Sequence, residues 1–230
     1  MIFELCTDSF EGALMAEKFA IKRIELCSAL SEGGQTPSYG LIKKCTKLSI
    51  EVHVMIRPRG GNFQYISDEI DIMKSDIESA KNLNASGVVF GVLNAQNEVD
   101  NINESLVLLA KSLGLEVTFH RAFDLVLDPF MAIQKLIDFK FDRILTSGLH
   151  EKAIDGIDLL SKLQKKYGER IQIMAGSGVN HENAMQFSKI GIKNIHFTSH
   201  KSIKDVELRM GSYNIPDPKK LKSILNCFNL

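Results

Sequence analysis

Residues 50–57 read IEVHVMIR, and the alternation in this stretch decides between two folds. Successive side chains of a strand point to opposite faces, so the four aliphatic residues share one face and the other four share the opposite face. A strand of an open parallel sheet, covered by helices on both sides, reads instead as a nearly continuous apolar run. One apolar face toward surrounding helices and one polar face toward a lumen therefore favour a closed barrel over an open sheet.

The same organisation extends along the whole chain. Short β-branched or aromatic runs alternate with helical patterns, at spacings of about 22 to 37 residues, near the ~30 of one βα unit. We expect strands to start near Ile2, Ile24, Ile50, Gly87, Leu115, Arg143, Ile171 and Asn194. Alternation of strands and helices implies a parallel sheet. Eight units in one undivided chain predict an α/β fold, a (βα)8 TIM barrel that forms a single domain over residues 1–230.

Proline and glycine positions predict where several helices begin and end. Thr36-Pro37, Asp128-Pro129 and Asp217-Pro218 each place a capping oxygen before a proline at the first helical position. Gly168 and Gly191 are expected to follow helix C-termini. Residues 200–215 form the longest stretch without a regular pattern, which is interpreted either as a lid over the barrel mouth or as a variable loop.

Composition excludes several classes of function. The 28 basic and 28 acidic side chains cancel, so the chain lacks the charge of a nucleic-acid binder, and no Lys/Arg-rich run indicates a membrane surface. The first ten residues do not resemble a signal peptide, and no apolar run approaches a membrane span. We therefore expect a cytoplasmic protein with reduced thiols, in which Cys45 and Cys227, on helical stripes, belong to the core.

A polar lumen is the unusual feature of the predicted barrel, because barrel interiors are normally filled with branched apolar side chains. Unpaired ionisable groups there would cost several kcal/mol each, so they must pair, bind a ligand or shift their pKa values. Either a structural hydrogen-bond network or a functional site would satisfy them. The inward residues are Glu4, Cys6, Glu25, Cys27, His53, Met55, Arg57, Thr118, His120, His196 and Thr198. We expect His53, Arg57, His120 and Thr198 at the carboxyl ends of the strands, where barrel enzymes keep their chemistry.

Two cysteines occur in an internal repeat, ELCT at residues 4–7 and ELCS at residues 25–28. On neighbouring parallel strands, about 4.8 Å apart, Cys6 and Cys27 would lie close together on one face. Two thiolates, with Met55 on the next strand, make a soft site that suits Cu(I). The alternative interpretation is that both are small buried hydrophobic residues.

Glycine-rich turns follow two later strands, TSG at residues 146–148 and AGSG at residues 175–178. Exposed N–H groups in such turns bind anions, and barrels of this type hold phosphate after strands seven and eight. Glycine in these turns is also explained by tight packing alone. The predicted anion-binding residues are Arg57, Ser147, Gly148, Gly176, Ser177 and Gly178.

Several of these motifs together resemble the CutC family. The matching segments are residues 25–34 (ELCSALSEGG), 54–61 (VMIRPRGG), 118–124 (TFHRAFD), 144–148 (ILTSG) and 174–178 (MAGSG). The resemblance implies a (βα)8 barrel, a cytoplasmic location, a homo-oligomer and a role in copper homeostasis, with Cu(I) held by the cysteines at positions 6 and 27. It implies no catalytic reaction.

Two functions follow as hypotheses. In the first, the protein serves copper homeostasis and binds Cu(I) through Cys6 and Cys27. In the second, it is an enzyme that acts on a small phosphorylated or carboxylated metabolite at the barrel mouth, where its acid–base or divalent-metal residues would be Glu4, Glu25, His53 and His120. Neither hypothesis includes a nucleic acid or a membrane as partner.

Overall fold

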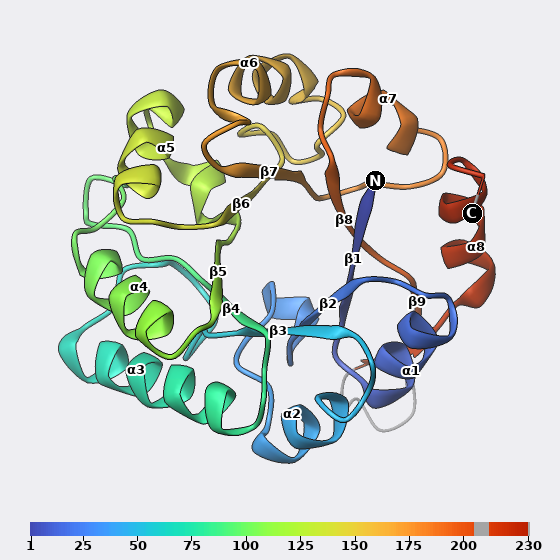
Figure 1. The fold of residues 1–230 in the computed structure, drawn as a ribbon, viewed down its shortest axis with the longest axis horizontal. Coiled ribbons are helices and arrows are strands. Elements are labelled where there is room, and N and C mark those ends of the chain that lie inside the picture. Colours follow the sequence, from blue (N-terminus) through green and yellow to red (C-terminus); the bar gives the residue numbers. More distant parts are fainter. Residues whose placement is uncertain (205–211, 230) are drawn as a thin grey trace.

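Eight strands form the centre of the molecule. They are β1 (Ile2–Thr7), β2 (Arg23–Leu26), β3 (Glu51–Met55), β4 (Gly87–Phe90), β5 (Glu116–Phe119), β6 (Arg143–Thr146), β7 (Gln172–Ala175) and β8 (Asn194–Thr198). In the computed structural model, which describes residues 1–204 and 212–229, these strands pair in parallel and in chain order. Hydrogen bonds between β1 and β8 close the barrel (Figure 1). The closed barrel confirms the predicted fold, and each strand begins within one residue of its predicted start.

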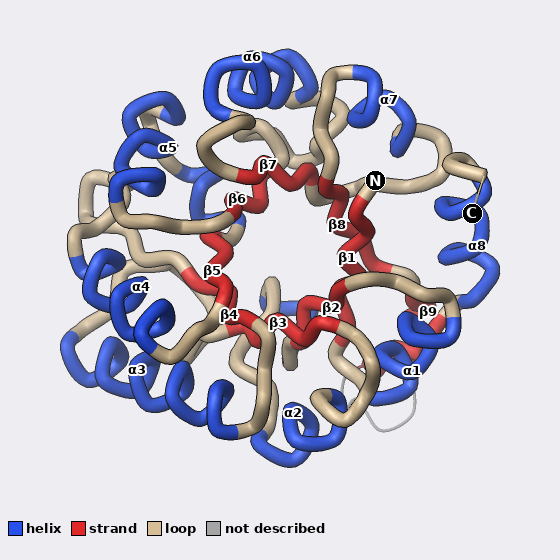
Figure 2. Tube along the Cα trace, in the orientation of Figure 1, coloured by secondary structure: helices blue, strands red, loops and turns tan. Residues whose placement is uncertain are grey.

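Helices surround the barrel, as Figure 2 shows in blue around the red strands. They are α1 (Phe10–Lys18), α2 (Tyr39–Cys45), α3 (Ser67–Asn82), α4 (Ile102–Ser112), α5 (Pro129–Asp138), α6 (Ile157–Tyr167), α7 (Ala184–Lys189) and α8 (Pro218–Asn226), with short 3-10 helices η1 (Leu30–Glu32) and η2 (Arg121–Leu125). None of the helices within the described ranges has the length and apolar composition needed to cross a membrane.

Two of the three predicted helix starts are confirmed. Asp128 and Asp217 accept hydrogen bonds from the first N–H groups of α5 and α8, with proline at the next position. The start predicted at Thr36-Pro37 is wrong by two residues, because α2 is capped by Ser38. The Thr36 hydroxyl accepts a hydrogen bond from the Arg57 backbone N–H (3.0 Å) instead, which ties this loop to the end of β3.

The alternation of residues 50–57 has the predicted consequence for packing. Val52 and Val54 belong to the main hydrophobic core, where strands pack against helical residues such as Ile70 and Met73. Met55, on the opposite face of β3, belongs instead to a small separate cluster with Cys6, Cys27 and Val89. The interior of the barrel is thus distinct from the core between strands and helices, and it contains the two cysteines.

The segment after β8 is more regular than expected. Strands β9 (His200–Lys204) and β10 (Ser212–Pro216) pair in antiparallel fashion, and residues 205–211 lie outside the described residues. Asn214 in β10 donates a hydrogen bond to the Asp8 carboxylate (2.9 Å), which places this pair of strands beside the carboxyl end of β1. The prediction of an irregular connection over residues 200–215 is therefore wrong for β9 and β10, because these two segments pair with each other as strands.

Candidate functional site at the barrel mouth

The two cysteines of the internal repeat lie together inside the barrel. Cys6 is in β1, and Cys27 directly follows β2, where its N–H donates to the Thr7 carbonyl (3.0 Å). Both side chains are buried, and their Sγ atoms are 4.0 Å apart. This distance confirms that the two strands bring the thiols into contact.

Glu25 joins the two thiols. Its Oε2 atom lies 3.3 Å from Cys6 Sγ and 3.4 Å from Cys27 Sγ, because Cys6 and Glu25 are partners in the β1–β2 register. The second oxygen, Oε1, is buried and has no hydrogen-bond partner among the described residues. A carboxylate oxygen in this position costs free energy unless a ligand satisfies it.

His196 completes the cluster, and its role was not predicted from the sequence. Its Nε2 atom lies 3.8 Å from Glu25 Oε2, while its Nδ1 atom lies 2.8 Å from Glu4 Oε1. Arg23 in turn pairs with Glu4, and all three groups are buried. The available signal was the barrel itself: in a closed barrel β8 neighbours β1, so an inward histidine on β8 must lie beside inward residues of β1.

The proton distribution in the cluster is asymmetric. A hydrogen bond from Cys27 lowers the pKa of Cys6 to about 5, despite burial, and the same contact raises the pKa of Cys27 well above its usual value. Burial, together with the charge of Cys6, raises the pKa of Glu25 well above its usual range. The contact between the two cysteines therefore favours ionisation of Cys6 over ionisation of Cys27.

Glu4 and His196, next to the thiols, have pKa values shifted toward their charged forms. Burial alone would raise the pKa of Glu4, but the Arg23 guanidinium and His196 hold it well below its usual range. Burial alone would lower the pKa of His196, but the acidic groups Glu25, Cys6 and Glu4 raise it well above its usual value. Arg23, Glu4 and His196 thus form a charged chain that ends at the cluster.

Arg57 holds the loop that covers the thiols. Its guanidinium donates to the carbonyls of Glu32 (2.7 Å), Gly34 (2.8 Å) and Gly61 (2.9 Å). Gly34, with φ +87°, packs so closely that an added Cβ would lie 3.2 Å from Cys27 Sγ. These contacts, made by the two terminal nitrogens of the guanidinium, give Arg57 a structural role in holding the loop.

The turn after β6 already contains an internal anion. The Asp124 carboxylate accepts hydrogen bonds from the N–H groups of Ser147 (3.0 Å) and Leu149 (3.3 Å), and from the Thr146 hydroxyl (2.5 Å). The N–H of Gly148 donates to Thr146 Oγ1 (2.9 Å). The donors expected to bind a ligand anion at residues 147 and 148 thus have partners within the protein.

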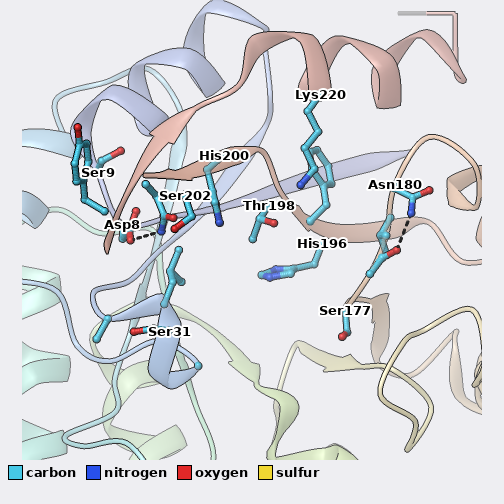
Figure 3. A pocket seen from close by; sticks show the side chains of 18 of the residues that line it. Asp8, Ser9, Ser31, Ser177, Asn180, His196, Thr198, His200, Ser202 and Lys220 are labelled. Atoms are coloured by element: carbon cyan, nitrogen blue, oxygen red, sulfur yellow. Dashed lines mark hydrogen bonds between the residues drawn. The ribbon is translucent and has the colours of Figure 1, made fainter. Parts of the chain in front are cut away.

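The turn after β7 is more open. Gly176 N–H donates to the Thr146 carbonyl (3.1 Å), and Ser177 Oγ donates to the Glu151 carbonyl (2.6 Å). Ser177 and Gly178 also line a cavity of about 970 Å³, to which η2, β8 and α8 contribute Arg121, His196 and Lys220. Figure 3 shows Lys220 pointing from α8 toward Thr198, and the His196 ring pointing into the same space.

The predicted catalytic residues do not form one group. Glu4 and Glu25 both contact His196, as described above. His53 lies 3.7 Å from Glu116, the first residue of β5, and therefore faces the amino ends of the strands. The expectation that His53 lies at the carboxyl ends is wrong, because its position in β3 places it one layer deeper.

His120 lies at the carboxyl end of β5, as expected, but outside the thiol cluster. Its Nδ1 atom accepts a hydrogen bond from the Ala122 N–H (3.3 Å), and its ring packs 4.6 Å from the Phe63 ring. Its Nε2 atom is buried without a hydrogen-bond partner among the described residues. Burial, with the nearby Arg57 charge, lowers the pKa of His120 to about 3.

Fold and site together define a class: a (βα)8 barrel with a thiol, carboxylate and imidazole cluster beside a polar cavity at its mouth. The chain belongs to the CutC family, whose model matches residues 1–201. A CutC family protein of Glaesserella parasuis is 44% identical over 243 residues, covering 100% of both chains. The human copper homeostasis protein cutC homolog is 45% identical over 183 residues, which cover 79% of this chain and 67% of the human one. The crystal structure of CutC from Streptococcus agalactiae, 37% identical, superimposes with a TM-score of 0.80 over 85% of this chain and 97% of that one.

Proposed function

We propose that the protein acts in copper homeostasis in the cytoplasm and binds Cu(I) through Cys6 and Cys27. The observation that carries this proposal is the 4.0 Å separation of two buried Sγ atoms. Soft thiolate and thioether ligands select Cu(I), and Met55 belongs to the same small cluster as both cysteines. The name of the human relative, a copper homeostasis protein, supports the same function.

The ionisation of the cysteines also supports Cu(I) binding. The thiolate is the form of cysteine that binds metals, and the pKa of Cys6 is lowered to about 5. Burial of both thiols beneath the loop of Gly34 keeps bulk water away from a bound ion. The homo-oligomer that the family resemblance implies stays a prediction, which light scattering on the purified protein would measure.

Anaerobic Cu(I) titration against a competing chelator tests the proposal. Because removal of even an outer-shell partner costs about 10–100-fold in metal affinity, we expect loss of both thiols in Cys6→Ser/Cys27→Ser to cost more than about a hundredfold. The matched control is Cys45→Ser/Cys227→Ser, which removes two thiols outside the cluster and should leave the affinity unchanged. Equal affinity of the Cys6/Cys27 variant and the parent would contradict the proposal.

The cavity favours a second candidate function, an enzyme that binds a small phosphorylated or carboxylated metabolite. Its volume of about 970 Å³ is that of a small-molecule site, and it opens at the carboxyl ends of the strands, where barrel enzymes bind substrates. Lys220 supplies positive charge, and the Ser177–Gly178 turn supplies polar groups on the same wall. Arg121 also lines the cavity, where its guanidinium pairs with Asp124 (2.8 Å). The anion site of this proposal therefore keeps Ser177 and Gly178 from the predicted set, adds Lys220, and omits Arg57, Ser147, Gly148 and Gly176.

Thermal unfolding with sugar phosphates and with small carboxylic acids tests this second function. A ligand at a hundredfold excess over its Kd stabilises a protein by about 2.7 kcal/mol, which corresponds to a rise in Tm of about 5–10 °C for a chain of this size. We expect Lys220→Met to reduce that rise, whereas Lys222→Met, an exposed lysine elsewhere on α8, should not. If neither the sugar phosphates nor the carboxylic acids raise the Tm, the proposed enzymatic function is contradicted.

A further inference from the structure

Three different ligand atoms converge beside the cavity. Cys6 Sγ, a carboxylate oxygen of Glu25 and a ring nitrogen of His196 all lie within 4.8 Å of one another, and all three side chains are buried. Cys6 Sγ is 3.3 Å from Glu25 Oε2, which is 3.8 Å from His196 Nε2. Ligand atoms about 2.0–2.3 Å from a tetrahedral zinc ion lie about 3.3–3.7 Å from one another. One of these two separations lies within that range and the other exceeds it by 0.1 Å, so small movements of the side chains would bring the three atoms around one ion.

An unsatisfied oxygen indicates that this cluster is incomplete in the protein alone. Glu25 Oε1 is buried and accepts no hydrogen bond from any described residue. Most buried polar atoms have a partner, and an exception needs an explanation. A cation held by both oxygens of this carboxylate supplies one, because Oε2 makes the contacts to Cys6 and His196 while Oε1 makes none.

The surroundings of His196 support the same interpretation. Metal-ligating histidines usually donate their other ring nitrogen to a carboxylate or carbonyl, which fixes the tautomer and the ring orientation. His196 Nδ1 lies 2.8 Å from Glu4 Oε1, so that Nε2 is the atom left to face Glu25 and Cys6, where a bound metal ion would take the place of the Nε2 proton. Arg23 pairs with the other oxygen of Glu4 and holds the carboxylate in place.

Cys27 is not part of this set. Its Sγ atom contacts Cys6 and Glu25, but among the described residues the group of mutually close ligand atoms contains Cys6, Glu25 and His196 only. One sulfur, one oxygen and one nitrogen suit a divalent ion such as Zn²⁺, whereas two sulfurs suit Cu(I). The two ligand sets share Cys6, so one ion would exclude the other.

We propose that Cys6, Glu25 and His196 form a three-ligand site for a divalent cation of the zinc class, adjacent to the mouth cavity. Three protein ligands and one free position are typical of catalytic rather than structural zinc sites. His196 lines both the cluster and the cavity, so an ion at this site lies next to any small molecule that the cavity holds. A bound ion there would polarise an oxygen of that molecule or lower the pKa of a bound water. This inference does not depend on copper binding.

Zn²⁺ titration with a competing chromophoric chelator tests the site, and Cu(I) titration of the same variants separates it from the cysteine pair. We expect Glu25→Gln and His196→Gln to lower the Zn²⁺ affinity more than about a hundredfold, and Glu4→Gln to lower it about 10–100-fold. Cys45→Ser, outside the cluster, is the matched control and should keep the Zn²⁺ affinity of the parent. Cys27→Ser removes a thiol that contacts Cys6 and Glu25, so it should lose less Zn²⁺ affinity than Cys6→Ser and should lose Cu(I) affinity. Thermal unfolding of each variant without metal establishes that it is folded. If His196→Gln does not fold, Glu25→Gln still tests the site.

The outcomes distinguish the two metal sites. The inference is wrong if the parent does not bind Zn²⁺, if Glu25→Gln and His196→Gln bind it as tightly as the parent, or if Cys27→Ser loses as much Zn²⁺ affinity as Cys6→Ser. None of these results affects the Cu(I) proposal. A loss of Cu(I) affinity in Cys27→Ser that is much larger than its loss of Zn²⁺ affinity supports both sites.

Discussion

Replacement of Arg23 by methionine is expected to lower the free energy of unfolding by about 3–5 kcal/mol, because it leaves a buried carboxylate without its strongest partner. Arg23 and Glu4 are paired and almost inaccessible to water, with side-chain exposures of 2% and 0%. Methionine fills much of the volume of the arginine side chain. The decrease in the free energy of unfolding therefore comes mainly from the unpaired Glu4 charge and not from a cavity. Urea unfolding at pH 7 measures the change.

Two further variants show whether the buried charge is the cause. In Glu4→Gln/Arg23→Met both charges are removed, and we expect this double variant to be more stable than Arg23→Met alone. Lys22→Met breaks the neighbouring pair with Glu51, in which the side chains are 57% and 37% exposed, and should change stability by less than about 1 kcal/mol. Equal losses for Arg23→Met and Lys22→Met would contradict this account.

Mild acid is expected to destabilise the protein through two buried histidines. Burial lowers the pKa of His53 to about 3, and burial with the nearby Arg57 charge lowers the pKa of His120 to about 3. In the unfolded chain histidine titrates near pH 6.5. Below that pH the two histidines bind protons in the unfolded state but stay neutral in the folded state. The stability present above pH 6.5 is therefore lost progressively as the pH falls toward 3. Each histidine should contribute about 2 kcal/mol of this loss at pH 5.

Urea unfolding between pH 7.5 and 5 measures this loss. His120→Asn retains an acceptor for the Ala122 N–H but does not titrate, so the decrease in stability over this range should be smaller by about 2 kcal/mol. His150→Asn, at an exposed position, is the matched control and should reproduce the parent. If the pH dependence of His120→Asn equals that of the parent, His120 is not the source of the acid sensitivity.

The fold was largely predictable because its signals are local. The alternation of residues 50–57 depends only on the period of a strand, and it separated the two faces of β3 as expected. The Asp-Pro pairs at residues 128–129 and 217–218 cap α5 and α8 through contacts within three residues. Thr36-Pro37 was misread because its hydroxyl is used by Arg57, 21 residues away.

The candidate site was only partly predictable. The contact between Cys6 and Cys27 follows from two neighbouring strands, so the repeat of residues 4–7 in residues 25–28 was sufficient evidence. His196 lies 192 residues from Glu4, and only closure of β8 onto β1 brings them together. The predicted closed barrel implies that β8 neighbours β1, but the register that brings His196 to Glu4 is a property of the tertiary structure.

The same distinction explains the anion-binding predictions. Sequence identifies groups that are able to donate hydrogen bonds, such as Arg57 and the N–H of Ser147. Whether those donors are free depends on which acceptors fold onto them, and here the Gly34 carbonyl and the Asp124 carboxylate do so. The amino-acid sequence by itself therefore determined the barrel and its pair of thiols, because strand period, helix caps and adjacent-strand pairing are short-range properties. Tertiary structure alone decided which polar groups are satisfied within the protein and which remain for a ligand, because that depends on contacts between distant segments.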